Sequence, residues 1–229
     1  MSPFRRALVV FLKAPVPGLV KTRLTPVLSP DEAAGFYRAL ARDTLDVVRD
    51  WAELSDGHFP RVAYQSHARF PDLRWTGFAG SFFEQEGTTL GDRLDHAFRR
   101  VFEEGHQQAV ALGTDAPEIS VDRLTEAFRS LDRHDAVLGP ARDGGYYLLG
   151  LRRPCPALFA EMPWSSDRVL AETIRRLDAA RLSHERLDVL DDIDDPSDVS
   201  ALARRMKEAG ARCPHSRDAL LKLNTGRIP

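Results

Sequence analysis

The chain has 229 residues, of which 43% are hydrophobic and 29% are charged, and its formal net charge is −2. This composition predicts one globular domain with a substantial core and argues against a wholly disordered chain. The near-neutral balance gives little support to nucleic acid or an anionic membrane surface as the main partner.

Targeting and redox signals are weak. No apolar run approaches the roughly 20 residues that cross a bilayer, and the first residues do not form a good signal peptide. We therefore expect a cytoplasmic protein without a membrane partner. Cys155 and Cys213 are too few and too far apart for a metal knuckle, so we interpret both as structural thiols. We expect residues 1–210 to form a single domain and residues 211–229 a loosely held C-terminal tail.

Apolar runs alternate with helical patterns along the chain. The first run, "ALVVFL", is followed by a helix with a capping box, in which Ser29 is the N-cap, Pro30 the first residue and Glu32 the third. Strands are predicted over residues 7–12, 61–65, 109–113, 136–140, 146–151 and 186–190. Later helices are predicted from residue 90, from residue 121 behind Ser120, within residues 165–177, and over residues 196–210.

This alternation of strands and helices predicts an α/β fold with a mostly parallel sheet flanked by helices. In such folds ligands bind outside the carboxyl ends of the strands, so the loops at these ends are the places to search for a site. One segment departs from the alternation. The run "DGG" at residues 143–145 lies between two apolar runs and predicts a reverse turn, and hence an antiparallel excursion.

The loop after the first strand, "FLKAPVPGLVKTRL", holds two of the four lysines of the chain. Lys13, Lys21 and Arg23 could converge on an anion such as a diphosphate or triphosphate, and Gly18 permits close backbone approach. A Walker loop requires glycine directly before the Lys-Thr pair, where this chain has Val20. The alternative interpretation is a solvated basic loop.

Two acidic segments follow strands. In "GTDAPEIS", Asp115 lies where the third predicted strand ends, and Gly113 leaves room beside it. A carboxylate there could hold Mg²⁺ or Mn²⁺, since these cations take oxygen ligands and bridge to phosphates; the alternative is an aspartate that caps a local turn. The run "LDDIDDPSDV" could supply a second ligand, or Asp195 or Ser197 could cap the last helix. Both interpretations of this run can hold at once.

Two further segments have structural alternatives. "DGGYYLLGL" could be only a hairpin, and "MPWSSDRVLAET" only an aromatic plug before a capped helix. The sequence contains no G-x-S-x-G pattern, which is the nucleophile motif of serine hydrolases with a Ser/His/Asp triad.

Five motifs in a fixed order are together more specific than each is alone: "FLKAPVPGLVKTRL", "GTDAPEIS", "GPARDGGYYLLGL", "MPWSSDRVLAET" and "LDDIDDPSDV". Over residues 7–205 they resemble a prokaryotic family of glycosyltransferase-like nucleotide-diphospho-sugar transferases, some of which are linked to radical-SAM gene clusters and arsenosugar biosynthesis. The resemblance implies the nucleotide-diphospho-sugar transferase fold, also called GT-A, which is Rossmann-like. The opening loop is also similar to that of the 2-phospho-lactate guanylyltransferases.

The resemblance implies roles for particular residues. Lys13, Lys21 and Arg23 would bind the phosphates of a nucleotide. Asp115 would be the first ligand of Mg²⁺ or Mn²⁺, and Asp194 the second.

The resemblance also implies an acceptor side. There Gly144, Gly145 and Tyr146 would lie near a small-molecule acceptor, Asp143 is a candidate general base, and residues 85–94 would help to shape the pocket. Three positions depart from the related patterns. Ala116 stands where the family commonly has cysteine, Asp195 replaces a threonine, and Gly113 stands where an Asp-x-Asp motif would place an acid.

The leading functional hypothesis is a metal-dependent glycosyltransferase that uses a sugar donor activated by a nucleoside diphosphate and an unidentified small acceptor. Metal on the two aspartates would stabilise the leaving group, and the lysines would offset its charge. The alternative is a nucleotidyltransferase that joins a nucleoside triphosphate to a phosphorylated small molecule and releases pyrophosphate. A third hypothesis is a nucleotide-binding module without catalysis. The sequence does not determine the oligomeric state.

Overall fold

The computed structural model describes residues 5–69, 72–208 and 213–223. A seven-stranded sheet forms its centre, with the strand order β3-β2-β1-β4-β6-β5-β7. The strands are β1 (Arg6–Lys13), β2 (His58–Gln65), β3 (Ser81–Glu84), β4 (Gln108–Leu112), β5 (Ala136–Pro140), β6 (Tyr146–Leu151) and β7 (His184–Arg186).

The sheet is mostly parallel. Strand β1 pairs in parallel with β2 and β4, β2 with β3, and β5 with β7. Strand β6 runs antiparallel to both neighbours, β4 and β5. The predicted fold class and the antiparallel excursion after the Asp143–Gly145 turn are therefore confirmed. Because β6 is reversed, its first residue lies at the same edge of the sheet as the last residues of β1, β4 and β5.

Six helices are described: α1 (Pro30–Ala52), α2 (Leu90–Glu103), α3 (Val121–Leu131), α4 (Val169–Ala179), α5 (Pro196–Glu208) and α6 (Pro214–Lys222). The predicted capping box at the start of α1 is present. The Ser29 side chain accepts a hydrogen bond from the Glu32 backbone amide, and the Glu32 carboxylate accepts one from the Ser29 amide. Ser120 caps α3 as predicted. Among the described residues no helix is both long enough and apolar enough to span a membrane.

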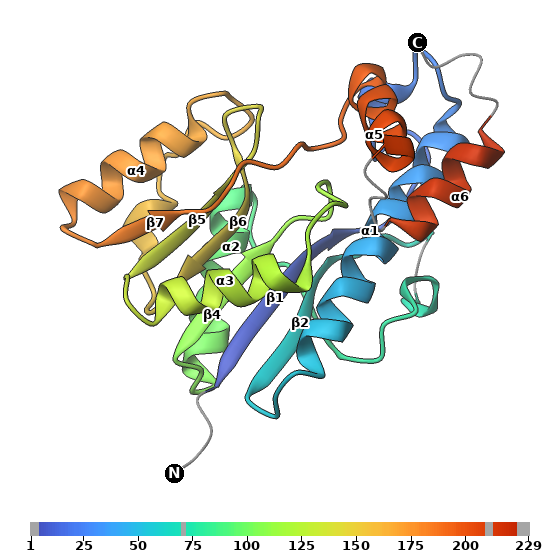
Figure 1. Ribbon diagram of the computed structural model, residues 1–229. Coiled ribbons are helices and arrows are strands. Elements are labelled where there is room, and N and C mark those ends of the chain that lie inside the picture. The colour runs from blue at the N-terminus through green and yellow to red at the C-terminus, as the bar shows by residue number, and fades with distance from the viewer. Residues whose placement is uncertain (1–4, 70–71, 209–212, 224–229) are drawn as a thin grey trace.

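The helices cover both faces of the sheet (Figure 1). On one face α1 and α3 pack on strand residues such as Leu8 and Val10, and on the other face α2 packs on residues such as Ala7 and Val9. Successive residues of β1 thus enter opposite cores, as the alternation of side chains along a strand requires. This explains why the buried strands are nearly continuous apolar runs.

A third apolar cluster lies beyond the carboxyl ends of the strands, where α5 and α6 lie beside the first half of α1 (Figure 1). Residues 211–229 are predicted to form a loosely held tail, but residues 213–223 include α6. Cys213, Leu220 and Leu223 are buried in this cluster, and the carboxylate of Asp43 in α1 accepts hydrogen bonds from the first amides of α6. The rest of the predicted tail lies outside the described residues.

Apart from shifts of up to three residues at the ends of β1, β2 and β4, two strands differ from the prediction. Strand β3 was not predicted, because it has only four residues and lies at the edge of the sheet. The strand predicted over residues 186–190 is shifted, since β7 ends at Arg186. The chain then leaves the sheet and touches it again through a single bridge between Ala141 and Leu190.

Candidate functional site

The loop after β1 is held by the fold. The backbone amide of Lys13 donates a hydrogen bond to the hydroxyl of Tyr37 in α1, at 2.9 Å, and Val20 and Leu24 are buried. Lys21 lies between Val20 and Leu24 in the sequence and has a left-handed backbone with φ 48°. Residues other than glycine rarely adopt this conformation, and they persist in it only where the surrounding structure imposes it.

The end of β4 positions Asp115. The amide of Gly113 donates to the carbonyl of Tyr147 in β6 at 2.9 Å, and the carbonyl of Asp115 accepts from the amide of Ile193 at 2.8 Å. The second bond fixes the acidic run 191–198 against the end of β4. Asp194 is therefore brought beside Asp115, although the two residues are 79 positions apart in the sequence.

The aspartates of the acidic run divide into two groups. Asp191 pairs with Arg142 and Arg205, while Asp195 accepts hydrogen bonds from the amides of Ser197 and Asp198 at the start of α5. These residues have structural partners, as the capping interpretation predicted for Asp195. The Asp198 carboxylate likewise accepts hydrogen bonds from the amides of Asp194 and Asp195, so Asp192 and Asp194 are the two aspartates left for the site.

Lys21 joins the two predicted metal ligands. Its Nζ lies 2.5 Å from Oδ1 of Asp115 and 2.9 Å from Oδ1 of Asp194, while its side chain is only 4% exposed. Burial alone lowers the pKa of Lys21, but the two carboxylates outweigh burial and raise it above its ordinary value. Lys21 is therefore a charged ammonium held between two acids.

Acidic side chains lie close together around this ammonium. Burial raises the pKa of Asp192 to about 8, and repulsion from Asp115, Asp143 and Asp194 contributes to the rise. Arg23, with a 71% exposed side chain, adds a weaker contact at 3.6 Å to Oδ2 of Asp194. Immediately around the Nζ of Lys21, the two carboxylates of Asp115 and Asp194 outnumber the one ammonium, which is an environment that favours a bound cation.

A cavity of about 370 Å³ opens on this cluster. Seven predicted site residues line it: Lys13, Lys21, Arg23, Gly113, Asp115, Tyr146 and Asp194. The side chains of Asp115 and Asp194 are 46% and 39% exposed, so a ligand in the cavity can reach both carboxylates. The structure therefore gathers residues from β1, β4, β6 and the start of α5 around one cavity.

The cavity also has an apolar part, to which the segment 85–94 contributes Leu90, as predicted. Leu19 and Leu90 line it and are among the exposed large hydrophobic residues of the molecule. Tyr37 and Thr114 contribute polar atoms, and burial raises the pKa of Tyr37 to about 12, so its hydroxyl stays neutral. Tyr37 belongs to the buried face of α1, and nothing in the sequence pattern separates it from core residues.

Four predicted site residues do not line this cavity: Gly18, Asp143, Gly144 and Gly145. The Asp143 carboxylate accepts a hydrogen bond from the amide of Gly145 at 2.8 Å and so stabilises the turn. Gly144 has φ +88°, and a Cβ atom there would collide with the backbone of Asp167. Its carbonyl accepts from the amide of Leu170 at 2.9 Å, so Gly144 joins the turn to the start of α4.

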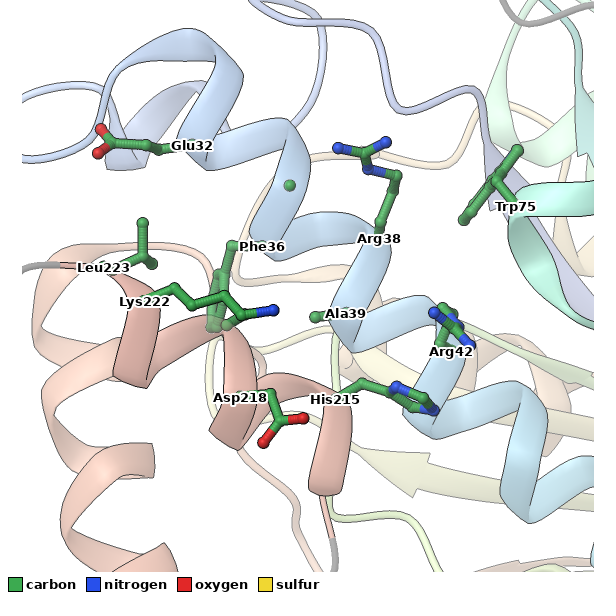
Figure 2. Close-up of a pocket in the computed structure, with 12 residues that line it drawn as sticks. Glu32, Phe36, Arg38, Ala39, Arg42, Trp75, His215, Asp218, Lys222 and Leu223 are labelled. Carbon is green, nitrogen blue, oxygen red and sulfur yellow. The ribbon is translucent and has the colours of Figure 1, made fainter.

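A larger hollow, of about 570 Å³, lies between α1 and α6. Figure 2 shows Arg38 and Arg42 of α1 and His215, Asp218 and Lys222 of α6 around it. It has no lining residue in common with the cavity at Asp115 and contains no residue from the end of a strand. The rule that ligands bind at strand ends therefore favours the smaller cavity.

Metal-binding geometry is incomplete within the protein itself. Among the described residues, no group of three or more His, Cys, Asp and Glu side chains is arranged to hold a metal ion.

Comparisons with solved structures show the same fold. The chain is 31% identical to a protein from Desulfovibrio desulfuricans G20 described as a "putative nucleotide-diphospho-sugar transferase", with a TM-score of 0.87, over 97% of this chain and 96% of that one. It is 14% identical to a CMP:2-keto-3-deoxy-manno-octonic acid synthetase complexed with CTP (TM-score 0.52, 90% and 99% covered).

A third match is the 4-diphosphocytidyl-2C-methyl-D-erythritol synthase from Anaerococcus prevotii DSM 20548, at 10% identity (TM-score 0.55, 88% and 99% covered). The last two likenesses show the fold alone. No curated protein matches the chain.

The fold and the resemblance carried by the sequence motifs are confirmed by these comparisons. A family model described as "Uncharacterized protein conserved in bacteria (DUF2064)" matches residues 51–166. The chain has the nucleotide-diphospho-sugar transferase fold and belongs to this bacterial family.

Proposed function

We propose that the protein is a metal-dependent glycosyltransferase that takes a sugar from a nucleoside diphosphate donor and passes it to a small acceptor. The observation that carries the proposal is the convergence of Asp115 and Asp194 on one ammonium at the cavity. The choice of reaction is supported by the 31% identity, over nearly the whole of both chains, to the protein described as a "putative nucleotide-diphospho-sugar transferase".

Asp115 and Asp194 would hold Mg²⁺ or Mn²⁺. The two Oδ1 atoms approach a single point, the Nζ of Lys21, and both side chains are partly exposed toward the cavity. Carboxylate oxygens are the ligands that these cations prefer. The metal, when bound, would neutralise the charge that develops on the departing diphosphate.

The remaining cavity residues would position the two substrates. Lys13 and Arg23 extend from the first loop and would bind phosphate oxygens. Tyr146, at the start of β6, lines the same cavity and would contact the acceptor. Gly144 and Gly145 would act by fixing the turn before β6, and Asp143, on that turn, stays a candidate general base.

A nucleotidyltransferase is the second candidate, and Gly113 favours it. Gly113 stands where an Asp-x-Asp motif of a glycosyltransferase would place an acid. The structure pairs Asp115 with a distant aspartate, Asp194, instead of with a neighbour in sequence. In this reaction a nucleoside triphosphate would be joined to a phosphorylated small molecule, and pyrophosphate would be released.

The products distinguish the two reactions. The protein is incubated with Mg²⁺, a filtered small-molecule cell extract as the source of acceptor, and either nucleoside diphosphate sugars or nucleoside triphosphates. ³¹P NMR then identifies the phosphorus products. Sugar transfer releases a nucleoside diphosphate, whereas nucleotidyl transfer releases pyrophosphate.

Two variants make the assay specific to the site. Asp115→Asn should abolish either product, while Asp56→Asn, in an exposed turn before β2, should leave the rate unchanged. Equal rates in Asp115→Asn and wild type would contradict both assignments. Pyrophosphate from a triphosphate, without diphosphate from any sugar donor, would replace the first proposal by the second.

A further inference from the structure

The position of Lys21 is unusual for a residue expected to bind phosphate. Its side chain is buried, its backbone is left-handed, and its ammonium contacts carboxylates. By contrast, Lys13 is exposed on the same cavity, and so is Arg23. In the first loop, Lys13 and Arg23 are therefore exposed to solvent, whereas the ammonium of Lys21 is buried against two carboxylates.

The ammonium lies where the proposed metal would compete with it. Its Nζ is within hydrogen-bonding distance of Oδ1 in both Asp115 and Asp194. A divalent ion bound by the same atoms would lie about 2 Å from each oxygen. Two cations that share these oxygens would lie only a few ångströms apart in a partly buried site, where their repulsion is strong.

We propose that Lys21 is the resting counter-ion of Asp115 and Asp194 and that it yields the two carboxylates to a divalent cation only when a phosphate anion takes over its ammonium. This inference rests on the proposed function and adds an order of binding to it. Lys21 itself lines the cavity, so rotation of its flexible side chain can bring the ammonium to a ligand there.

Charge balance supports the exchange. With Lys21 in place, the three groups carry a net charge of −1, which a divalent ion alone would reverse. The diphosphate of a sugar nucleotide carries two negative charges, and together with the two carboxylates it more than balances the metal and the released ammonium. Metal and phosphate should therefore each strengthen the binding of the other, since coupling between two ligands is reciprocal.

The test measures the binding of Mn²⁺ alone, by the loss of the electron paramagnetic resonance signal of the free ion. Lys21→Met removes the charge at similar volume, and Lys207→Met, on an exposed position of α5, is the matched control. We expect Lys21→Met to bind Mn²⁺ at least about tenfold more tightly than wild type, because the competing cation is gone. The control should bind like wild type, and adding Asp115→Asn to Lys21→Met should remove the gain.

An affinity of Lys21→Met for Mn²⁺ that is equal to or lower than that of wild type would overturn the proposal. Circular dichroism checks that the variants are folded, and Lys21→Gln repeats the test if the Met variant is not.

A measurement on the wild-type protein needs no substitution. With ¹⁵N-labelled lysine, the Lys21 ammonium signal should stay in place with Mg²⁺ alone and should shift when Mg²⁺ and inorganic pyrophosphate are both added. A shift with Mg²⁺ alone, or no shift with both, would contradict the exchange.

These results are separable from the assay of products. If Lys21→Met gains affinity for Mn²⁺ while wild type converts no donor, the exchange stands and the transferase assignment fails. If wild type converts a donor while Lys21→Met gains no affinity, the assignment stands and the exchange fails.

Discussion

Individual residues of the two loops beside the site are constrained by backbone geometry. Gly18 and Gly144 both have positive φ, at +81° and +88°. They differ in their surroundings, because a Cβ at Gly18 would meet open space whereas one at Gly144 would collide with Asp167. An alanine substitution at Gly18 therefore tests backbone strain alone, whereas one at Gly144 tests strain together with a steric collision.

We expect Gly18→Ala to lower the free energy of unfolding by about 1 kcal/mol, the cost of a left-handed alanine. Gly144→Ala should lower it by about 3 kcal/mol, since the collision adds to the strain. Urea denaturation of both variants gives the two values. Equal losses would show that the contact between the turn and residue 167 does not constrain the fold.

His58 predicts a dependence of stability on pH. Its ring stacks on Trp51, with 3.9 Å between centroids, and burial lowers the pKa of His58 below its ordinary value. Between the folded and unfolded pKa values the unfolded chain binds more protons, so stability should fall as the pH drops below about 6.5.

In His58→Gln, the loss of unfolding free energy between pH 7.5 and pH 5.5 should be smaller than in wild type. His67→Gln, in the loop after β2, controls for the removal of an imidazole. An undiminished loss in His58→Gln would mean that other groups cause the pH dependence.

Among the six α-helices of the described residues, α6 is the one that was not predicted from the sequence. Leu220 is buried in the cluster formed with α1 and α5, whereas its neighbour Leu221 is 77% exposed. We expect Leu220→Ala to lower the free energy of unfolding by about 3 kcal/mol and Leu221→Ala to change it by no more than about 0.5 kcal/mol. Denaturant unfolding measures both; equal small effects would show that α6 adds no stability.

The elements differ in how well the sequence predicted them, for physical reasons. Strands β5 and β6 were predicted with their observed bounds, because buried strands are apolar runs that end at turn residues. Strand β3 is short and at an edge, so its pattern is weak. Helix α6 carries polar and apolar residues without a clear helical pattern, and its apolar residues are buried only by packing against α1 and α5.

For the whole molecule, the sheet decides which parts of the sequence meet. The sequence placed Lys13, Lys21 and Asp115 at strand ends, and the parallel order of β1 and β4 brings those ends together. Asp194 was selected by resemblance, and the backbone bond between Ile193 and Asp115 explains its position. The contact of Lys21 with both acids could not be predicted, since it depends on the path of the loop and of residues 187–195 across the sheet edge.

Isothermal titration calorimetry with nucleoside diphosphates and triphosphates, each with and without Mn²⁺, tests most directly whether this cavity binds a nucleotide and a metal ion. Wild type, Asp115→Asn and Asp56→Asn are compared. We expect at least one nucleotide to bind wild type and Asp56→Asn in a Mn²⁺-dependent manner, and to bind Asp115→Asn at least about tenfold more weakly, because one of two metal ligands is lost. Equal affinity of Asp115→Asn and wild type, or binding that Mn²⁺ does not affect, would contradict the assignment of this cavity.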